Sequence, residues 1–171
     1  MSTSSSIRFT SGKSPRIAEH LQGCGESGWA PHYEGFFRCF NAERYYEAHD
    51  VLEELWLSQG KDHYDHSYFK GLIQTAGAFV HMKLQRENPD HRVHGARLHP
   101  AGRLLRLAQH NVEPYGETHL GLNLTSLRRM LAAYGESLSK GEYRLNPWQP
   151  SRGPQLTLIP KSPALDLSSQ L

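Results

Sequence analysis

The sequence lacks cysteine clusters, long apolar runs and a marked net charge. Two cysteines among 171 residues are too few for a disulfide framework or a cysteine-based metal motif. No apolar run approaches the roughly 20 residues that cross a bilayer, which excludes a membrane span, and the amino terminus has no apolar segment of a secretory signal. A formal net charge of +2 is far below the dense basic stripe of a dedicated nucleic-acid binder. These absences predict a soluble protein of the reducing cytoplasm.

The first 29 residues also lack a sustained hydrophobic period. They are rich in serine and glycine, so we expect residues 1–29 to be mostly irregular, with one short helical turn near residues 16–21. Arg8, Lys13 and Arg16 precede the first acidic residue, which gives this stretch a weak likeness to an organelle transit peptide. A polar tail accounts for the same composition more simply.

The other end of the chain is set apart by its prolines. Between residues 146 and 171 proline recurs too often for a helix, which predicts an extended tail. The leucines of the tail alternate with other residues, at Leu156 and Leu158 and at Leu165 and Leu167. We expect this alternation to lay the tail along the domain surface. Residues 30–145 remain as one helical domain.

Hydrophobic spacing predicts helices over most of that domain. Apolar residues recur at helical intervals, and Pro31, Asp65 and Pro100 suit helix starts. The predicted helices cover residues 31–40, 44–58, 65–86, 100–110 and 125–140. The third is apolar all round from His66 to Met82, so we expect it to be central, with its glycines and alanines letting neighbouring helices approach closely. The predicted fold class is therefore all-α, an irregular bundle of about five helices around a central apolar helix.

The helix predicted over residues 44–58 has two distinct faces. At about 100° per residue, an apolar arc is formed by Tyr45, Ala48, Val51, Leu52, Leu55 and Trp56. The opposite side carries the acidic residues Glu47, Asp50 and Glu54. We expect the acidic side to face water. His49 and Glu53 continue the apolar arc, so we expect both to be at least partly buried.

Two stretches of the sequence resemble a known family. Residues 40–56 read FNAERYYEAHDVLEELW, and residues 69–81 read FKGLIQTAGAFVH. Together they resemble the family called domain of unknown function 309, whose members carry FN, EAH, E and W in that order, then a GLIQ helix that ends near a histidine. The resemblance covers about residues 36–107 and carries onto Phe40, Asn41, Glu47, Ala48, His49, Glu53, Trp56, Gly71, Leu72, Ile73, Gln74 and His81. What it implies is a compact α-helical bundle without an agreed biochemical activity.

Polar residues on two of the predicted helices form the candidate site. His49 and Glu53 are four residues apart, the spacing at which two helical side chains touch or bind one ion. Gln74 and His81 lie on a polar stripe of the central helix, which we expect to pack against them. If the stripes face each other, these four residues make an interior polar cluster. Its further members would be Tyr45, Trp56 and Lys70.

Three interpretations of this cluster remain open. His49, Glu53 and His81 would hold one divalent metal ion as cofactor, with a fourth position for water, as in sites for hydrolysis or small-molecule binding. Alternatively, the pair of His49 and Glu53 would act without metal as a general base and its orienting partner. The third interpretation is structural: the side chains hydrogen-bond one another and fix two helices in register, because a buried, unpaired carboxylate is costly. No nucleophile accompanies the cluster, so the sequence points to no particular reaction.

Features outside the cluster supply an alternative function. Five arginines lie in or near the later helices: Arg97, Arg103, Arg106, Arg128 and Arg129. They would make the protein an interaction module for nucleic acid or an acidic partner, although such residues more often form a solvated face. His91, His94 and His99 share one loop and could bind a metal, but histidines spaced in this way in a loop without cysteine usually form no metal site. A homodimer would form if the helix over residues 31–40 exposed its aromatic side chains.

Overall fold

The structure of this chain is a computed structural model that describes residues 14–162. Within that range the chain forms six α-helices, two short 3₁₀ helices and one two-stranded hairpin. Between residues 14 and 162, no helix combines the length and the apolarity that crossing a bilayer requires. The transit-peptide likeness at Arg8 and Lys13 and the leucine pair Leu165 and Leu167 lie outside the described residues. The fold is mainly all-α, as the hydrophobic pattern predicted.

The helices begin and end close to the predicted boundaries. The α-helices are α1 (Ser14–His20), α2 (Pro31–Asn41), α3 (Tyr45–Gln59), α4 (His66–Glu87), α5 (Leu98–Val112) and α6 (Leu124–Lys140). The shorter elements are η1 (His94–Ala96), η2 (Glu113–Tyr115), β1 (Thr118–His119) and β2 (Leu122–Asn123). Pro31 opens α2, where its missing N–H is no loss, and Asn123 caps α6 by accepting from the Ser126 N–H. The five predicted helices are α2 to α6, and their prediction is confirmed.

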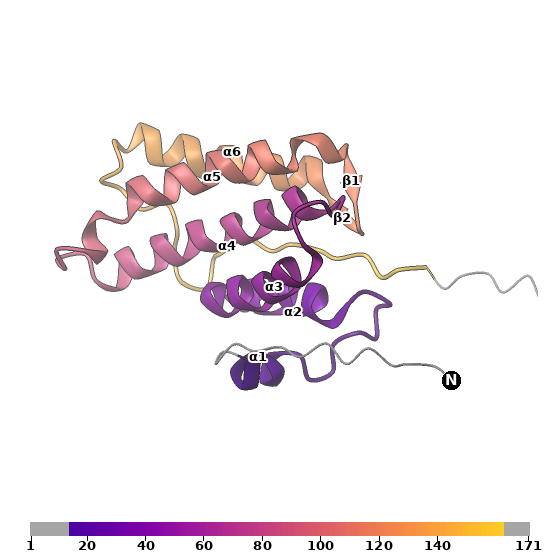
Figure 1. Ribbon diagram of the computed structural model, residues 1–171. Coiled ribbons are helices and arrows are strands. Elements are labelled where there is room, and N and C mark those ends of the chain that lie inside the picture. Colours follow the sequence, from indigo (N-terminus) through magenta and orange to yellow (C-terminus); the bar gives the residue numbers. More distant parts are fainter. Residues whose placement is uncertain (1–13, 163–171) are drawn as a thin grey trace, which may run out of the picture.

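The helices are arranged in layers around α4. Figure 1 shows α2 and α3 on one side of α4, α5 and α6 on the other, and α1 outside α2 and α3. Along α4 the side chains of Phe69, Leu72, Ala76, Ala78 and Phe79 are all buried. A helix that is apolar all round needs neighbours on opposite sides, and α4 has them. The expected central helix is confirmed.

Small residues let α5 approach α4 closely. A Cβ atom on Gly71 would lie 2.7 Å from Cγ1 of Val112 and 3.2 Å from the carbonyl oxygen of Ala108. A Cβ atom on Gly77 would lie 3.1 Å from Cδ1 of Leu104. All three neighbours belong to α5, so these glycines have the packing role that the sequence suggested.

The aromatic residues of α2 are buried in the core. Tyr33, Phe36, Phe37 and Phe40 are at most 4% exposed. Phe36 and Phe37 meet edge to face at 5.2 Å between ring centroids, and Phe40 meets Phe79 of α4 in the same way at 5.4 Å. The homodimer that the sequence left open would need these rings to be exposed on α2, and instead α3 and α4 cover them.

The described part of the tail, residues 146–162, runs extended against the helices. Trp148 and Leu156 are buried. The side-chain amide of Asn41 donates to the Leu156 carbonyl and its oxygen accepts from the Leu156 N–H. Leu158 forms a bridge with Leu122 of β2. The tail therefore ties the α2 side of the bundle to the hairpin.

Candidate functional site

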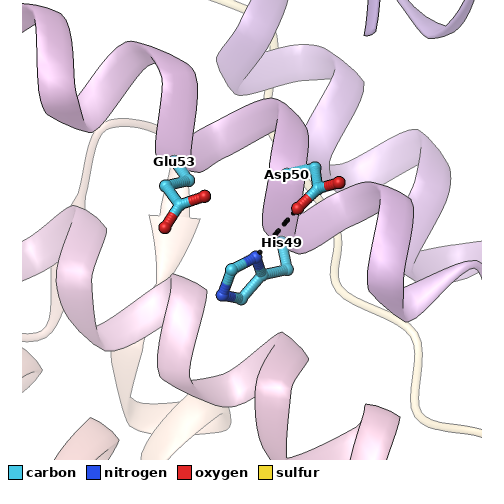
Figure 2. Close-up of side chains that lie close together, drawn as sticks. All are labelled: His49, Asp50 and Glu53. Carbon is cyan, nitrogen blue, oxygen red and sulfur yellow. Dashed lines mark hydrogen bonds and ion pairs between the residues drawn. The ribbon is translucent and has the colours of Figure 1, made fainter. Parts of the chain in front are cut away.

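α3 brings three metal-ligating side chains together on one turn. His49, Asp50 and Glu53 each contribute one donor atom, and these atoms lie within 4.8 Å of one another. Figure 2 shows the His49 ring turned toward the Asp50 carboxylate, with the Glu53 carboxylate one turn further along α3. Positions three and four apart on a helix are neighbours, so the helix itself supplies this convergence. In the described part of the chain, no other three histidine, cysteine or acidic side chains converge in this way.

The spacing of two of these donors suits one divalent ion. His49 Nδ1 and Asp50 Oδ1 are 3.3 Å apart. Two ligands that each lie about 2.1 Å from a shared ion are about 3.0 Å apart at octahedral angles and about 3.4 Å apart at tetrahedral angles. The observed separation falls in that interval. Glu53 supplies a third donor, which lies within 4.8 Å of the other two.

Asp50 is the buried member of the group. Its side chain is 3% exposed, and Oδ2 accepts a hydrogen bond from Arg16 Nη2 of α1 at 2.7 Å. The hydrogen bond to Asp50, followed by the contact with Tyr46, raises the pKa of Arg16. The Arg16 guanidinium also lies 5.5 Å from the centre of the Tyr46 ring. One oxygen of Asp50 is therefore held by α1, while the other faces His49.

The acidic side of α3 does not face water, which corrects the sequence-based expectation. Asp50 is buried and Glu47 is half-buried. The Glu54 side chain is 11% exposed, with Oε1 3.5 Å from His32 Nε2 of α2. The physical reason is that α1 lies against α3 and that Arg16 neutralises the charge that the packing buries. An isolated helical pattern contains no information about such a covering segment.

His49 is half-buried, as expected, and its ring has a defined orientation. A carboxylate oxygen accepts hydrogen bonds and donates none, so in the 3.3 Å contact Nδ1 is the donor. Moving the Nδ1 proton to Nε2 would make Nδ1 available as a metal ligand. The same geometry therefore serves an imidazole oriented by a carboxylate or an imidazole bound to an ion.

The polar stripe of α4 does not complete the group at His49. Gln74 accepts a hydrogen bond from Asn111 Nδ2 of α5 at 2.7 Å. His81 is half-buried, and its Nδ1 accepts from Arg97 Nη1 at 3.0 Å. Lys70 is exposed. Because α5 packs closely on α4, its side chains and those just before it reach Gln74 and His81.

Tyr45 and Trp56, the aromatic additions to the predicted cluster, also have partners elsewhere. Trp148 Nε1–H donates to the Tyr45 hydroxyl at 3.0 Å, and burial raises the pKa of that hydroxyl. Trp56 Nε1–H donates to the His66 carbonyl at 3.0 Å, and its ring lies 4.8 Å from the His66 ring. Both side chains link α3 to neighbouring segments.

The later arginines have different environments. Arg97 is half-buried between histidines. Arg128 donates to two carbonyl groups at the end of α5. Arg103, Arg106 and Arg129 are exposed. The surface suggested by the sequence therefore retains three arginines that point to solvent.

The three loop histidines, His91, His94 and His99, do not converge on one place where an ion could bind. The rings of His91 and His94 are 4.5 Å apart, whereas the His99 ring stacks on Tyr143 at 4.3 Å. His94 Nδ1 accepts from Arg97 Nε at 2.8 Å. A nitrogen that accepts from a guanidinium is unavailable to a metal while that bond persists.

Sequence reasoning missed two residues of the site, Asp50 and Arg16. Asp50 follows His49 directly in the chain, a signal that was outweighed by its position on the acidic side of the helix. Arg16 lies in α1, at the short helical turn expected near residues 16–21, but its partner is 34 residues away. A contact of that range leaves no local pattern.

The match to known proteins falls on the part of the chain that carries the site. No curated protein and no solved structure matches the chain. Residues 33–94 match the family model described as Domain of unknown function (DUF309). This range includes most of α2 and all of α3 and α4, and with them His49, Asp50, Glu53 and His81. Residues 33–94 are therefore similar to the DUF309 family, as the two sequence motifs indicated, and the description of that family names no activity.

Proposed function

We propose that this chain is a metal-binding domain that holds one divalent ion between His49, Asp50 and Glu53. The observation that carries the proposal is the convergence of their three donor atoms within 4.8 Å. One imidazole nitrogen and two carboxylate oxygens form a mixed donor set that suits divalent ions of the first transition row, such as Zn²⁺ or Mn²⁺. In this proposal Asp50 takes the place that the sequence had given to His81.

The charges around the group support a cation as its ligand. Asp50 and Glu53 are two carboxylates, and Arg16 is the guanidinium that contacts one of them. With His49 neutral, these four side chains carry one net negative charge. The group is partly removed from water, where charges are screened less than on an open surface. A divalent ion is opposite in sign to the two carboxylates that it would bind.

The proposed chemistry follows from the number of protein ligands. An ion held by three side chains keeps positions for water or for a small ligand. Such an ion lowers the pKa of bound water and polarises oxygen atoms of a ligand. The His49 side chain is 31% exposed, so solvent reaches the site. The proposal ends at metal binding, because the description of the matching family names no activity.

Elemental analysis of the natively purified, untagged protein tests the proposal, since a histidine tag would add its own metal. We expect a near-stoichiometric divalent metal in the native chain and its loss in His49→Ala, because one of three ligands is removed. The matched control is His63→Ala, which removes an exposed histidine of the loop between α3 and α4. That variant should keep its metal.

Circular dichroism and urea unfolding of the same samples separate loss of metal from loss of fold. A folded His49→Ala chain without metal supports the site. A native chain that is purified without metal and takes up neither Zn²⁺ nor Mn²⁺ on titration contradicts it. His49, Asp50 and Arg16 would then be a hydrogen-bonded tie between α1 and α3.

We also propose that the domain works in a reducing compartment such as the cytoplasm. Cys24 and Cys39 are both free thiols. Burial raises the pKa of Cys39 to about 11. Its thiol is therefore protonated near neutrality and a poor nucleophile.

A further inference from the structure

A second group of nitrogen-bearing side chains meets on the other side of α4. We call it the imidazole–arginine cluster, and its members are His81, His94, Arg97 and Arg103. Arg97 Nη1 donates to His81 Nδ1 at 3.0 Å, and Arg97 Nε donates to His94 Nδ1 at 2.8 Å. The Arg97 guanidinium is therefore held from two directions by imidazoles. Arg103, six residues further along the chain in α5, is close enough to act electrostatically on His81.

The loop that presents His94 and Arg97 is fixed by its own hydrogen bonds. His91 Nδ1 accepts from the N–H groups of Val93 and His94, each at 3.1 Å. The Gly95 N–H donates to the His91 carbonyl at 2.7 Å. A Cβ atom on Gly95 would collide with the carbonyl oxygen of Pro89, so the loop closes tightly at this point. A guanidinium held in this way is oriented before any ligand arrives.

Arg97 has donors to spare. A guanidinium carries five N–H donors, and the two imidazoles take two of them, which leaves three. Across the described range 14–162, neither Arg97 nor Arg103 forms an ion pair with a carboxylate. Half-buried charges are usually paired, because partial removal from water is costly without a counter-charge. The pairing that Asp50 gives to Arg16 has no equivalent here.

The histidines of the cluster add donors without adding charge. Burial, then Arg97 and Arg103, lower the pKa of His81. Burial, then Arg97 and His91, lower the pKa of His94. Both rings are therefore neutral near pH 7, and because each accepts at Nδ1, each carries its proton on Nε2. The cluster has two positive charges, and no acid takes part in either shift.

We propose that the imidazole–arginine cluster binds a phosphate-type oxyanion, either free phosphate or the phosphate group of a small molecule. The remaining N–H groups of Arg97 form part of a planar fork, which matches the oxygen atoms of phosphate. Arg103 is exposed and supplies the second charge from the solvent side. This ligand is opposite in sign to the metal proposed at His49, so the two proposals stand or fall separately.

Titration of the ¹⁵N-labelled full chain with inorganic phosphate, at constant ionic strength, tests the proposal by nuclear magnetic resonance. We expect saturable amide shifts at His81, His94 and Arg97. In Arg97→Gln the affinity should fall at least about tenfold, because a charged hydrogen-bond donor is lost. In Arg103→Gln, which removes an exposed charge, it should fall several-fold with the fold unchanged. The control Arg129→Gln removes an exposed arginine of α6 and should bind phosphate as the native chain does.

A short single-stranded oligonucleotide forms the second arm of the experiment. If it binds more tightly than phosphate and is weakened equally by Arg103→Gln and Arg129→Gln, the charge belongs to an extended polyanion surface and the localised site is wrong. Linear, unsaturated shifts with phosphate would overturn the proposal as well. So would equal loss of phosphate binding in Arg103→Gln and Arg129→Gln. Because Arg103 is exposed, its variant remains informative even if Arg97→Gln fails to fold.

Discussion

His49 and His81 are two half-buried imidazoles on adjacent helices, and their surroundings have opposite charge. His49 Nδ1 lies 3.3 Å from a carboxylate oxygen of Asp50. His81 Nδ1 lies 3.0 Å from a guanidinium nitrogen of Arg97. The sequence placed both rings in one cluster, whereas in the structure a carboxylate lies beside His49 and a guanidinium lies beside His81. A histidine in a motif therefore predicts a polar site, and its neighbours in space decide which ligand suits that site.

Segments outside the two helices create this difference. α1 brings one arginine to the acidic group, and Asp50 pairs with it. η1 and the start of α5 bring Arg97 and Arg103 to His81 without any acid. α1 and η1 are short and polar, whereas α5 also packs Leu98, Ala101 and Leu105 into the apolar core. The arginines beside both histidines therefore come from outside α3 and α4.

Gly95→Ala should have the largest effect, and it acts on one of the two sites. The added methyl group collides with the carbonyl oxygen of Pro89, so the loop that carries His94 and Arg97 must move. We expect a loss of about 1–3 kcal/mol in the free energy of unfolding, as for overpacked sites. Phosphate binding at the imidazole–arginine cluster should be lost, and metal binding at His49 should be kept. Urea unfolding and the two titrations measure these effects.

Gly135→Ala is the matched control for that substitution. Apart from its chain neighbours and the adjacent backbone of α6, no atom of the described residues lies within 4 Å of a Cβ placed on Gly135. Alanine in a helix interior is more stable than glycine by roughly 0.5–1 kcal/mol, so this variant should gain stability. If Gly95→Ala behaved in the same way, the loop would not be the rigid support that the hydrogen bonds indicate.

Lowering the pH should reduce the stability of the chain through His81 and His94, by less than Gly95→Ala does. The pKa values of His81 and His94 are lowered in the folded chain, by burial and by Arg97, with Arg103 acting on His81 and His91 on His94. The unfolded chain therefore binds more protons as the pH falls through the ordinary histidine value of about 6.5. The contribution of these two histidines to stability is therefore fully present above that pH. It is lost progressively as the pH falls from that value to the folded pKa values.

The measurement is the urea midpoint between about pH 8 and about pH 5, the range in which histidine titrates. In His81→Gln the fall in the midpoint should be shallower than in the native chain, because one of the lowered groups is gone. An identical fall in both proteins would show that groups other than His81 cause the loss of stability at low pH.

Most of the fold was predictable because its signals are local. The apolar run of α4 identifies a central helix, and Pro31 and Asn123 mark helix starts within a few residues of themselves. α1 was harder to predict: its helix of seven residues has one buried apolar side chain, Ile17, too few for a periodic signal. Its position against α3 is a tertiary fact that no spacing encodes.

In the candidate site too, local features were predictable from the sequence and contacts between distant residues were not. The spacing of His49 and Glu53 is local and was seen in the sequence. The burial of Asp50 depends on Arg16, 34 residues earlier, and was assigned to the wrong environment. His81 was expected beside His49 because it lies on the polar stripe of the helix expected to pack there, but the rotation of α4 between its two neighbours decides which helix that stripe meets. Sequence patterns therefore identified the polar residues, whereas the packing of the helices determines which of them contact each other.

Arg16→Gln is the smallest of the expected effects and the one that tests how the two sites differ. Removing the guanidinium takes a hydrogen bond from buried Asp50, so stability should fall slightly. The same change removes a positive charge that competes for the Asp50 carboxylate, so the affinity for Zn²⁺ should rise, by roughly threefold for a solvent-exposed charge. Arg92→Gln removes an exposed arginine of the loop before η1 and controls for net charge. A rise in both variants would reflect net charge alone. A fall in Arg16→Gln would mean that Arg16 orients Asp50 for the metal, in which case α1 would be part of the site.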